Sequence, residues 1–224
     1  MLYSVLNGGK RIRPFIISEI SSLYQVKSSG YKYPAMAIAM AQSFSLIYDD
    51  LPCMDNDNLR RGKLTTHKKF SESTAILAGN SLLTIAFQIL SQKKLNLSEK
   101  KKIKLINLLS ESSGHSGIAG GQYLDLSYEK IKKNKRQIID MQIKKTGKLF
   151  SFCCVAPVIM SGKIKYLGIF NKIGNEIGLL FQIADDLIDL KGKTSSVGKK
   201  TRKDLKMGKA TLISLLGTKN TIKY

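Results

Sequence analysis

The sequence predicts an all-α protein, a single domain whose helices surround a deep cleft. Apolar residues recur at helical spacing along almost the whole chain, and no long stretch shows the alternation of a half-buried strand. Only four prolines interrupt the pattern. The length of 224 residues is enough for one sizeable core and does not require a second domain.

In chain order, the apolar spacing predicts helices over 10–23, 34–50, 71–92, 98–111, 116–125, 135–154, 155–162, 165–190 and 209–216. Pro34 suits the first turn of its helix, and Ser98 is a suitable N-cap for the fourth. We expect turns at 28–30, 55–62 and 191–198, where glycine and polar residues gather.

Composition disfavours a membrane protein and a secreted one. The most apolar stretch, 76–90, is interrupted by polar residues, and no run reaches the roughly 18 residues of a membrane span. The N-terminal residues lack the apolar core and cleavage site of a signal peptide. Cys53, Cys153 and Cys154 form an odd set without metal-ligand spacing, so we expect reduced thiols and a cytoplasmic protein.

The formal net charge of +21 raises the question of nucleic-acid binding. The excess is almost entirely lysine, scattered over expected helix faces and loops, because the chain has only six arginines. Aromatic residues are not interleaved with the basic ones, as they are in many single-strand binders. We therefore expect a lysine-rich surface on an enzyme and no nucleic-acid partner.

The strongest anions are concentrated in two strings. Seven of the ten aspartates lie in them: Asp49, Asp50, Asp55 and Asp57, then Asp185, Asp186 and Asp189. In the second string, Asp185 and Asp189 are four residues apart and therefore share one helix face. Carboxylates packed this closely repel one another unless a cation relieves them, and oxygen-only ligands favour magnesium over zinc. A solvated acidic patch is the alternative.

The first string places Asp49 and Asp50 at the end of a helix, where the helix dipole disfavours anions. A metal ion would compensate that cost. Arg60 and Arg61 follow immediately and can bind a diphosphate with paired hydrogen bonds. An acidic loop that happens to precede two arginines is the alternative.

A third string, Asn7-Gly8-Gly9-Lys10-Arg11-Ile12-Arg13-Pro14, combines glycines with cations. Glycines let a backbone approach an anion closely, and Lys10 and Arg13 lie one helical turn apart. This predicts a phosphate site without metal. The alternative is a charged helix start after a turn.

Taken together, the strings GGKRIRP, DDLPCMDNDNLRRGK, GGQYLDL, KKTGKLF, FQIADDLIDLKG and GKKTRKDLKMGK resemble, in order and approximate spacing, the trans-isoprenyl diphosphate synthases, and most of all the bacterial farnesyl diphosphate synthases. The resemblance extends from Leu6 to Gly217. It implies the isoprenoid synthase helical bundle, without some outer N- and C-terminal helices of the family. It also implies a homodimer and three Mg²⁺ ions per site when substrate is bound.

The resemblance assigns a role to each matching residue. Magnesium ligands are Asp49, Asp55, Asp185, Asp186 and Asp189, supported by Asp50. Isopentenyl diphosphate contacts are Lys10, Arg13, Gln42 and Arg61. Contacts to the allylic substrate are Arg60, Lys145, Thr146, Gln182, Lys199 and Lys209, of which Thr146, Gln182 and the Lys145 carbonyl also stabilise the allylic cation. His67 and His115 are expected to take no part, because the departing diphosphate itself accepts the proton.

The implied activity is head-to-tail condensation of isopentenyl diphosphate with dimethylallyl or geranyl diphosphate. Phe44 and Ser45 precede Asp49 by five and four residues, and face the space that the growing tail must enter. An aromatic residue at the Phe44 position accompanies fifteen-carbon product in relatives, so we expect (2E,6E)-farnesyl diphosphate. A geranylgeranyl diphosphate synthase, an inactive truncated form and a partner subunit of the same fold are alternatives. Residues 199–209 are expected to form a flexible lid.

Overall fold

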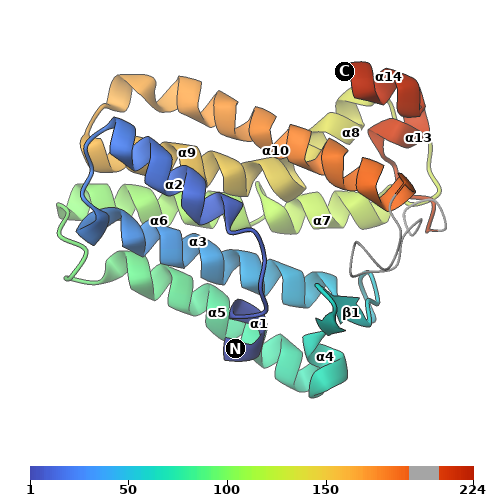
Figure 1. The fold of residues 1–224 in the computed structure, drawn as a ribbon, viewed down its shortest axis with the longest axis horizontal. Helices are drawn as coiled ribbons and strands as arrows, with labels where there is room; N and C mark the ends of the chain where they lie inside the picture. The colour runs from blue at the N-terminus through green and yellow to red at the C-terminus, as the bar shows by residue number, and fades with distance from the viewer. Residues whose placement is uncertain (192–206) are drawn as a thin grey trace.

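The computed structural model describes residues 1–191 and 207–224. It is an all-α bundle, as expected, with one short hairpin (Figure 1). The α-helices are α1 Leu2–Val5, α2 Ile12–Leu23, α3 Ser28–Asp49, α4 Thr66–Lys69, α5 Glu72–Ser91, α6 Glu99–Ser113, α7 Ile118–Ser127, α8 Lys135–Gln142, α9 Lys148–Ser161, α10 Leu167–Lys191, α13 Leu212–Leu216 and α14 Thr218–Lys223. The remaining elements are strands β1 Leu59–Arg60 and β2 Lys63–Leu64, the π-helix η1 Ile143–Gly147 and the 3₁₀-helix η2 Ile164–Tyr166.

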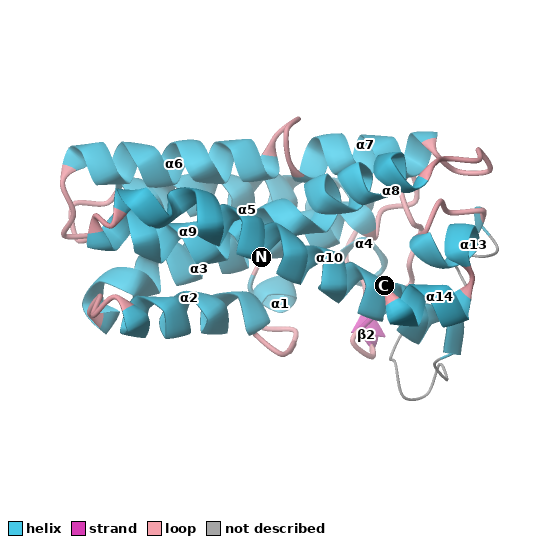
Figure 2. Ribbon diagram, turned by 90° about the horizontal axis from the view of Figure 1, so that it is seen from above, coloured by secondary structure: helices cyan, strands magenta, loops and turns pink. Residues whose placement is uncertain are grey.

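Helix α9 is the centre of the bundle. All its residues from Leu149 to Met160 are buried, which follows from a sequence that is apolar or small on every side. It packs against α2, α6 and α10, and its Phe152 is fully buried in the main core with Ile38 of α3 and Leu109 of α6. Figure 2 shows the long helices running roughly along one direction, with α13 and α14 grouped at one end.

Helix α5 packs along α3 on the outside of the bundle (Figure 1). Among the described residues it is the single helix long and apolar enough to cross a bilayer by length and composition. Its face toward α3 and the core is buried through Ala75, Leu82 and Leu90. Its opposite face is open, with Leu77 66% exposed, so α5 is buried on one side only.

Helix α3 differs from the sequence prediction at its N-terminal end. It begins at Ser28, so the turn expected at 28–30 is wrong, and Pro34 lies inside the helix rather than in its first turn. Proline removes one helical hydrogen bond at that point. Burial of Tyr33, Pro34 and Ala37 in the bundle offsets the loss.

The predicted boundary between 154 and 155 is also wrong. Helix α9 runs through it, and the irregularity lies earlier, at η1, where α8 continues into α9 through one turn of π-helix. A π-turn inserts an extra residue into a helix without a distinctive sequence signal, and it is frequent at functional sites. The chain does end this helix at Gly162, which has a φ of 81°.

Short elements near the cavity were not predicted. The hairpin β1–β2 pairs Leu59 with Leu64; β1 lies inside the turn expected at 55–62, and β2 follows it directly. The C-terminal helix begins at Leu212 instead of residue 209, because Thr211 forms a capping box with Ser214. The turn expected at 191–198 lies, apart from its first residue, outside the described residues.

Candidate functional site

The two aspartate strings line one cavity. The cavity has a volume of about 780 Å³ and is bounded by α3, α7, η1, α10 and the segment that precedes α13. Asp49 and Asp55 lie on one wall, at and after the end of α3, and Asp185 lies on α10. The other predicted site residues that line it are Lys10, Arg13, Gln42, Phe44, Ser45, Arg60, Arg61, Lys145, Thr146, Gln182, Asp186, Asp189 and Lys209.

The loop after α3 folds back onto the end of its own helix. The amide of Asp55 donates to the carbonyl of Asp49 at 2.9 Å, and the amide of Asp57 donates to that of Asp50 at 3.2 Å. These bonds satisfy carbonyls that a helix C-terminus leaves without partners. They also bring the Asp55 side chain back beside Asp49, which explains why residues six apart share one wall.

Asp50 has a different position from its neighbour Asp49. It is only 3% exposed; it accepts a hydrogen bond from Arg60 Nε at 2.7 Å and forms an ion pair with a terminal guanidinium nitrogen of Arg60 at 2.6 Å. Burial lowers the pKa of Arg60, but the carboxylates of Asp50, Asp49 and Asp57 outweigh it and raise the pKa above its ordinary value. Asp50 therefore holds Arg60 in place from behind the cavity.

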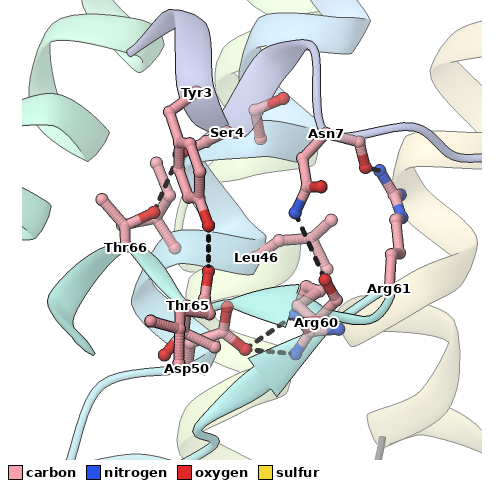
Figure 3. A pocket seen from close by; sticks show the side chains of 12 residues that line it. Tyr3, Ser4, Asn7, Leu46, Asp50, Arg60, Arg61, Thr65 and Thr66 are labelled. Atoms are coloured by element: carbon pink, nitrogen blue, oxygen red, sulfur yellow. Dashed lines mark hydrogen bonds and ion pairs between the residues drawn. The ribbon is translucent and has the colours of Figure 1, made fainter. Parts of the chain in front are cut away.

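Figure 3 shows the contacts that fix the hairpin behind this pair. Asn7 donates through its side-chain amide to the carbonyl of Arg60 at 3.2 Å, and the Tyr3 hydroxyl donates to the carbonyl of Leu64 at 2.6 Å. Arg61 donates to the carbonyl of Gly8 at 2.8 Å. The N-terminal string and the RRG string are thereby joined, although 53 residues separate Gly8 from Arg61.

A separate part of the cavity, away from the aspartates, is lined by cations. Gly9 has a φ of 100°, and the Arg61 guanidinium lies where a side chain at this position would be. Burial, with the nearby charges of Arg60 and Arg11, lowers the pKa of Arg61. Arg13 is buried, with its guanidinium 4.3 Å from the Phe150 ring centre and its Nε without a hydrogen-bond partner. Its burial lowers its pKa to about 10, which is the signature of a cation that would gain from a bound anion.

The π-helix directs two consecutive side chains, Lys145 and Thr146, into the cavity. Lys145 donates to Asp125 at 2.8 Å and lies 3.8 Å from Asp49. On the other side, Lys209 donates to the same Asp125 oxygen at 2.6 Å and to Asp55 at 3.1 Å. Both lysine ammonium groups therefore bridge Asp125 to the first aspartate string.

Asp125 is the main site residue that sequence reasoning missed. It is 6% exposed, and it lies on α7 in the GGQYLDL string between two leucines. Burial alone would raise the pKa of Asp125, but Lys145 and Lys209 outweigh it and hold the pKa below its ordinary value. A single carboxylate in an otherwise apolar helix segment was the available signal.

Amide side chains organise the second aspartate string. Thr146 donates through its hydroxyl to Gln182 Oε1 at 2.8 Å, and Gln182 Nε2 donates to Asp186 at 2.8 Å. Gln142 donates to the other oxygen of Asp186 at 3.2 Å. Asp186 is thus buried within a network that orients Gln182 toward Thr146, in addition to lining the cavity.

The donor set fits a hard divalent cation that binds together with a diphosphate. The cavity carboxylates offer only oxygen ligands. Within residues 1–191 and 207–224, no three acidic, histidine or cysteine side chains converge into a ready metal site. Magnesium is usually bound through one or two carboxylates plus substrate phosphates, so an arrangement spread over two walls suits it better than a closed cage would.

Two predictions concerned residues of which little or nothing is described. Lys199 lies outside the described residues, as does most of the lid expected over 199–209. Its last residue, Lys209, is buried and ion-paired. Neither His67 nor His115 lines the cavity; His67 is buried beside Thr65.

Comparisons with known proteins bear on the family and the fold of the chain. The sequence model of the polyprenyl synthetase family matches residues 1–223. The chain is similar to a farnesyl diphosphate synthase of Micrococcus luteus, with 44% identity over 96% of this chain and 74% of the relative. It is also similar to geranylgeranyl pyrophosphate synthase 4 of Arabidopsis thaliana, with 38% identity over 100% of this chain and 61% of the relative.

One solved structure in particular resembles the bundle. It is a geranyltransferase of Helicobacter pylori complexed with magnesium and isoprenyl diphosphate, and the TM-score is 0.90 at 34% identity. The match covers 100% of this chain and 75% of that one.

Proposed function

Because this chain belongs to the polyprenyl synthetase family, we propose that its cavity condenses isopentenyl diphosphate with dimethylallyl or geranyl diphosphate. The products are (2E,6E)-farnesyl diphosphate and diphosphate. One observation carries the proposal. A single cavity has aspartates on two walls and a separate group of cations, Lys10, Arg13 and Arg61, so it can bind two diphosphates in different ways.

The cationic group binds isopentenyl diphosphate without metal. Arg61 and Arg13 present guanidinium groups suited to paired hydrogen bonds with phosphate oxygens, and Arg13 has an Nε that no described residue satisfies. Lys10 adds a third positive charge, and Gln42 lies on the adjacent α3 wall. Binding of the diphosphate removes the mutual repulsion of these cations.

The aspartate walls bind the allylic diphosphate through magnesium. Asp49 and Asp55 on one wall, and Asp185 with Asp186 and Asp189 on α10, would hold three ions. Arg60, Lys145 and Lys209 would contact the diphosphate oxygens, and so would Lys199, which lies outside the described residues. When bound, Mg²⁺ supplies Lewis-acid stabilisation of the charge on the leaving diphosphate. Lys145 lies 3.8 Å from Asp49 and Lys209 lies 3.1 Å from Asp55, so both ammonium groups stand beside the carboxylates that would hold the metal.

The carbon–carbon bond forms between the two substrates. The allylic carbon–oxygen bond breaks, the double bond of isopentenyl diphosphate attacks the allylic carbon, and the departing diphosphate accepts the proton that is lost. Thr146 and Gln182 are held by each other at 2.8 Å, so their oxygen dipoles are fixed before the allylic cation develops. The carbonyl of Lys145 adds a third dipole from the π-helix.

Farnesyl diphosphate, rather than a longer product, is supported by the wall beyond Asp49. Phe44 lies on the cavity side of α3 about 7.5 Å along the helix axis from Asp49, at roughly 1.5 Å per residue. Its ring contacts Tyr48, with 4.8 Å between ring centres. Geranylgeranyl diphosphate is the second candidate, since relatives with that activity are also similar.

The test is incubation of the purified protein with isopentenyl and geranyl diphosphates, with magnesium or with a chelator, followed by chromatography of the products. Magnesium-dependent farnesyl diphosphate supports the proposal. A twenty-carbon main product would favour the second candidate. Absence of any condensation by a folded protein would contradict both and favour an inactive or partner subunit.

A homodimer and a cytoplasmic location are part of the same proposal. Support for the dimer comes from exposed apolar residues on α5 and α7, among them Leu77 and Tyr123, at 66% and 71% exposure. Support for the location comes from three free cysteines, which suit a reducing compartment. Sedimentation analysis of the pure protein tests the dimer.

A further inference from the structure

Helix α5 contacts the cavity wall through a glycine and its neighbour. Tyr48 lines the cavity, and its ring rests on Gly79 so closely that a Cβ at Gly79 would overlap the ring's Cε2 and lie 2.7 Å from Cδ2. The Cβ would also be 3.5 Å from Cδ2 of Phe44. The absence of a side chain at position 79 thus allows the Tyr48 ring to lie back against α5, whereas a Cβ there would only touch Phe44 at an ordinary contact distance.

The residue after this glycine holds the ring in place. The Tyr48 hydroxyl donates to Asn80 Oδ1 at 2.6 Å, and lies 3.3 Å from the carbonyl of Ile76. Tyr48 in turn packs against Phe44, at 4.8 Å between ring centres and an interplanar angle of 57°. A chain of contacts therefore runs from α5 to the ring that faces the growing product.

From these contacts we infer that Gly79 and Asn80 determine the product length, by fixing Tyr48 and through it Phe44. This inference rests on the proposed function. Gly79 sets how far the Tyr48 ring withdraws from the cavity, and Asn80 keeps that ring withdrawn. Neither residue lines the cavity itself.

The change Gly79→Ala gives a directional prediction. The added methyl needs about 3.5 Å or more from ring carbons, so the Tyr48 ring must move by roughly 1 Å. Helix α5 blocks movement away from the cavity, and the ring moves toward the product. Because one methyl group in a binding pocket discriminates by about tenfold or more, the ratio of geranyl to farnesyl diphosphate is expected to rise about tenfold.

The experiment measures that ratio in Gly79→Ala, in Tyr48→Ala and in the double variant. Tyr48→Ala removes the ring and lengthens the product. The double variant should match it, because the ring that the methyl displaces is gone and Phe44 lies at an ordinary contact distance of 3.5 Å. Gly168→Ala is the matched control, because a Cβ at this exposed helical glycine contacts nothing within 4 Å. If Gly79→Ala does not fold, Asn80→Ala replaces it. Without the 2.6 Å hydrogen bond the Tyr48 ring is free to move into the cavity, so a larger share of geranyl diphosphate is expected.

For Gly79→Ala, three outcomes would overturn the inference. They are an unchanged ratio of geranyl to farnesyl diphosphate, a longer product, or a change in product length that persists in the Tyr48→Ala background. The last would show that the methyl acts on helix packing and not through the ring. An unchanged product share in Asn80→Ala counts against it equally. If wild-type protein and Gly168→Ala make farnesyl diphosphate, such results refute only this inference; if neither condenses the substrates, the proposed function fails first.

Discussion

Asp125→Asn should destabilise the protein, because it removes the ion-pair partner that Lys145 and Lys209 share. The wild-type carboxylate is 6% exposed and is bonded to Lys145 at 2.8 Å and Lys209 at 2.6 Å, both short, charge-assisted contacts. Removing one partner from a buried ion pair typically costs 3–5 kcal/mol. In the variant, Lys145 still has Asp49 as a partner at 3.8 Å, and Lys209 still has Asp55 at 3.1 Å. We therefore expect a loss of unfolding free energy at the lower end of this range, about 3 kcal/mol.

Thermal unfolding of the metal-free protein, followed by circular dichroism, measures this loss. At 2–4 °C per kcal/mol for a chain of this size, the midpoint should fall by roughly 6–12 °C. The matched control is Asp140→Asn, which breaks an exposed pair with Lys144 of similar length, 3.0 Å, and should change stability by less than about 1 kcal/mol. If Asp125→Asn shifts the midpoint no more than Asp140→Asn does, the argument for a buried anchor is wrong.

The same variant has a pH signature. The lysines hold the pKa of Asp125 below its ordinary value, so its contribution to stability is complete above the ordinary value, about 3.9, and is lost as pH falls through the lowered folded-state pKa. The difference in unfolding free energy between wild type and Asp125→Asn should therefore be constant near pH 7. It should shrink below about pH 4. A difference that grows in acid would contradict the assigned direction.

Three further variants separate the functions of the cavity walls. Phe44→Ala should lengthen the product toward geranylgeranyl diphosphate, as chromatography will show; an unchanged product spectrum removes Phe44 from that role. Arg61→Gln should raise the KM for isopentenyl diphosphate about 10- to 100-fold, the loss of a charged hydrogen bond, and leave the KM for geranyl diphosphate near wild type. An equal rise in both constants would refute separate subsites. Thr146→Val should lower kcat about tenfold with little change in either KM, since its dipole acts on the developing cation; a change in KM alone would place it in ground-state binding.

The sequence was sufficient to predict most of the charged residues that line the cavity, though not Asp125. Asp49 and Asp185 are 136 positions apart, yet each has an unusual placement that indicates a site. Asp49 lies at the helix end where the dipole disfavours an anion, and Asp185 lies beside a second carboxylate on an apolar helix. Their charges are costly unless a ligand compensates, so local sequence alone predicts a site. The helices themselves follow from period, which is a local property as well.

What the sequence did not predict depends on contacts between distant segments. The π-turn at Ile143–Gly147 is one extra residue inside a helix, and nothing in its composition distinguishes it from α-helix. Asp125 acquires its role only when Lys209, 84 residues later, is brought beside it. Propensity places Pro34 at a helix start, because the tertiary burial that keeps the helix intact through the proline is not a local property of the sequence.

Binding of inorganic pyrophosphate in the presence of magnesium tests the central claim most directly, as a double-mutant cycle of Asp49→Asn and Asp185→Asn measured by calorimetry. If carboxylates from both walls share ions around one diphosphate, the two losses in binding free energy will be non-additive by more than about 1 kcal/mol, and the coupling will vanish without magnesium. Losses that simply add within about 0.5 kcal/mol would mean that the walls bind independently.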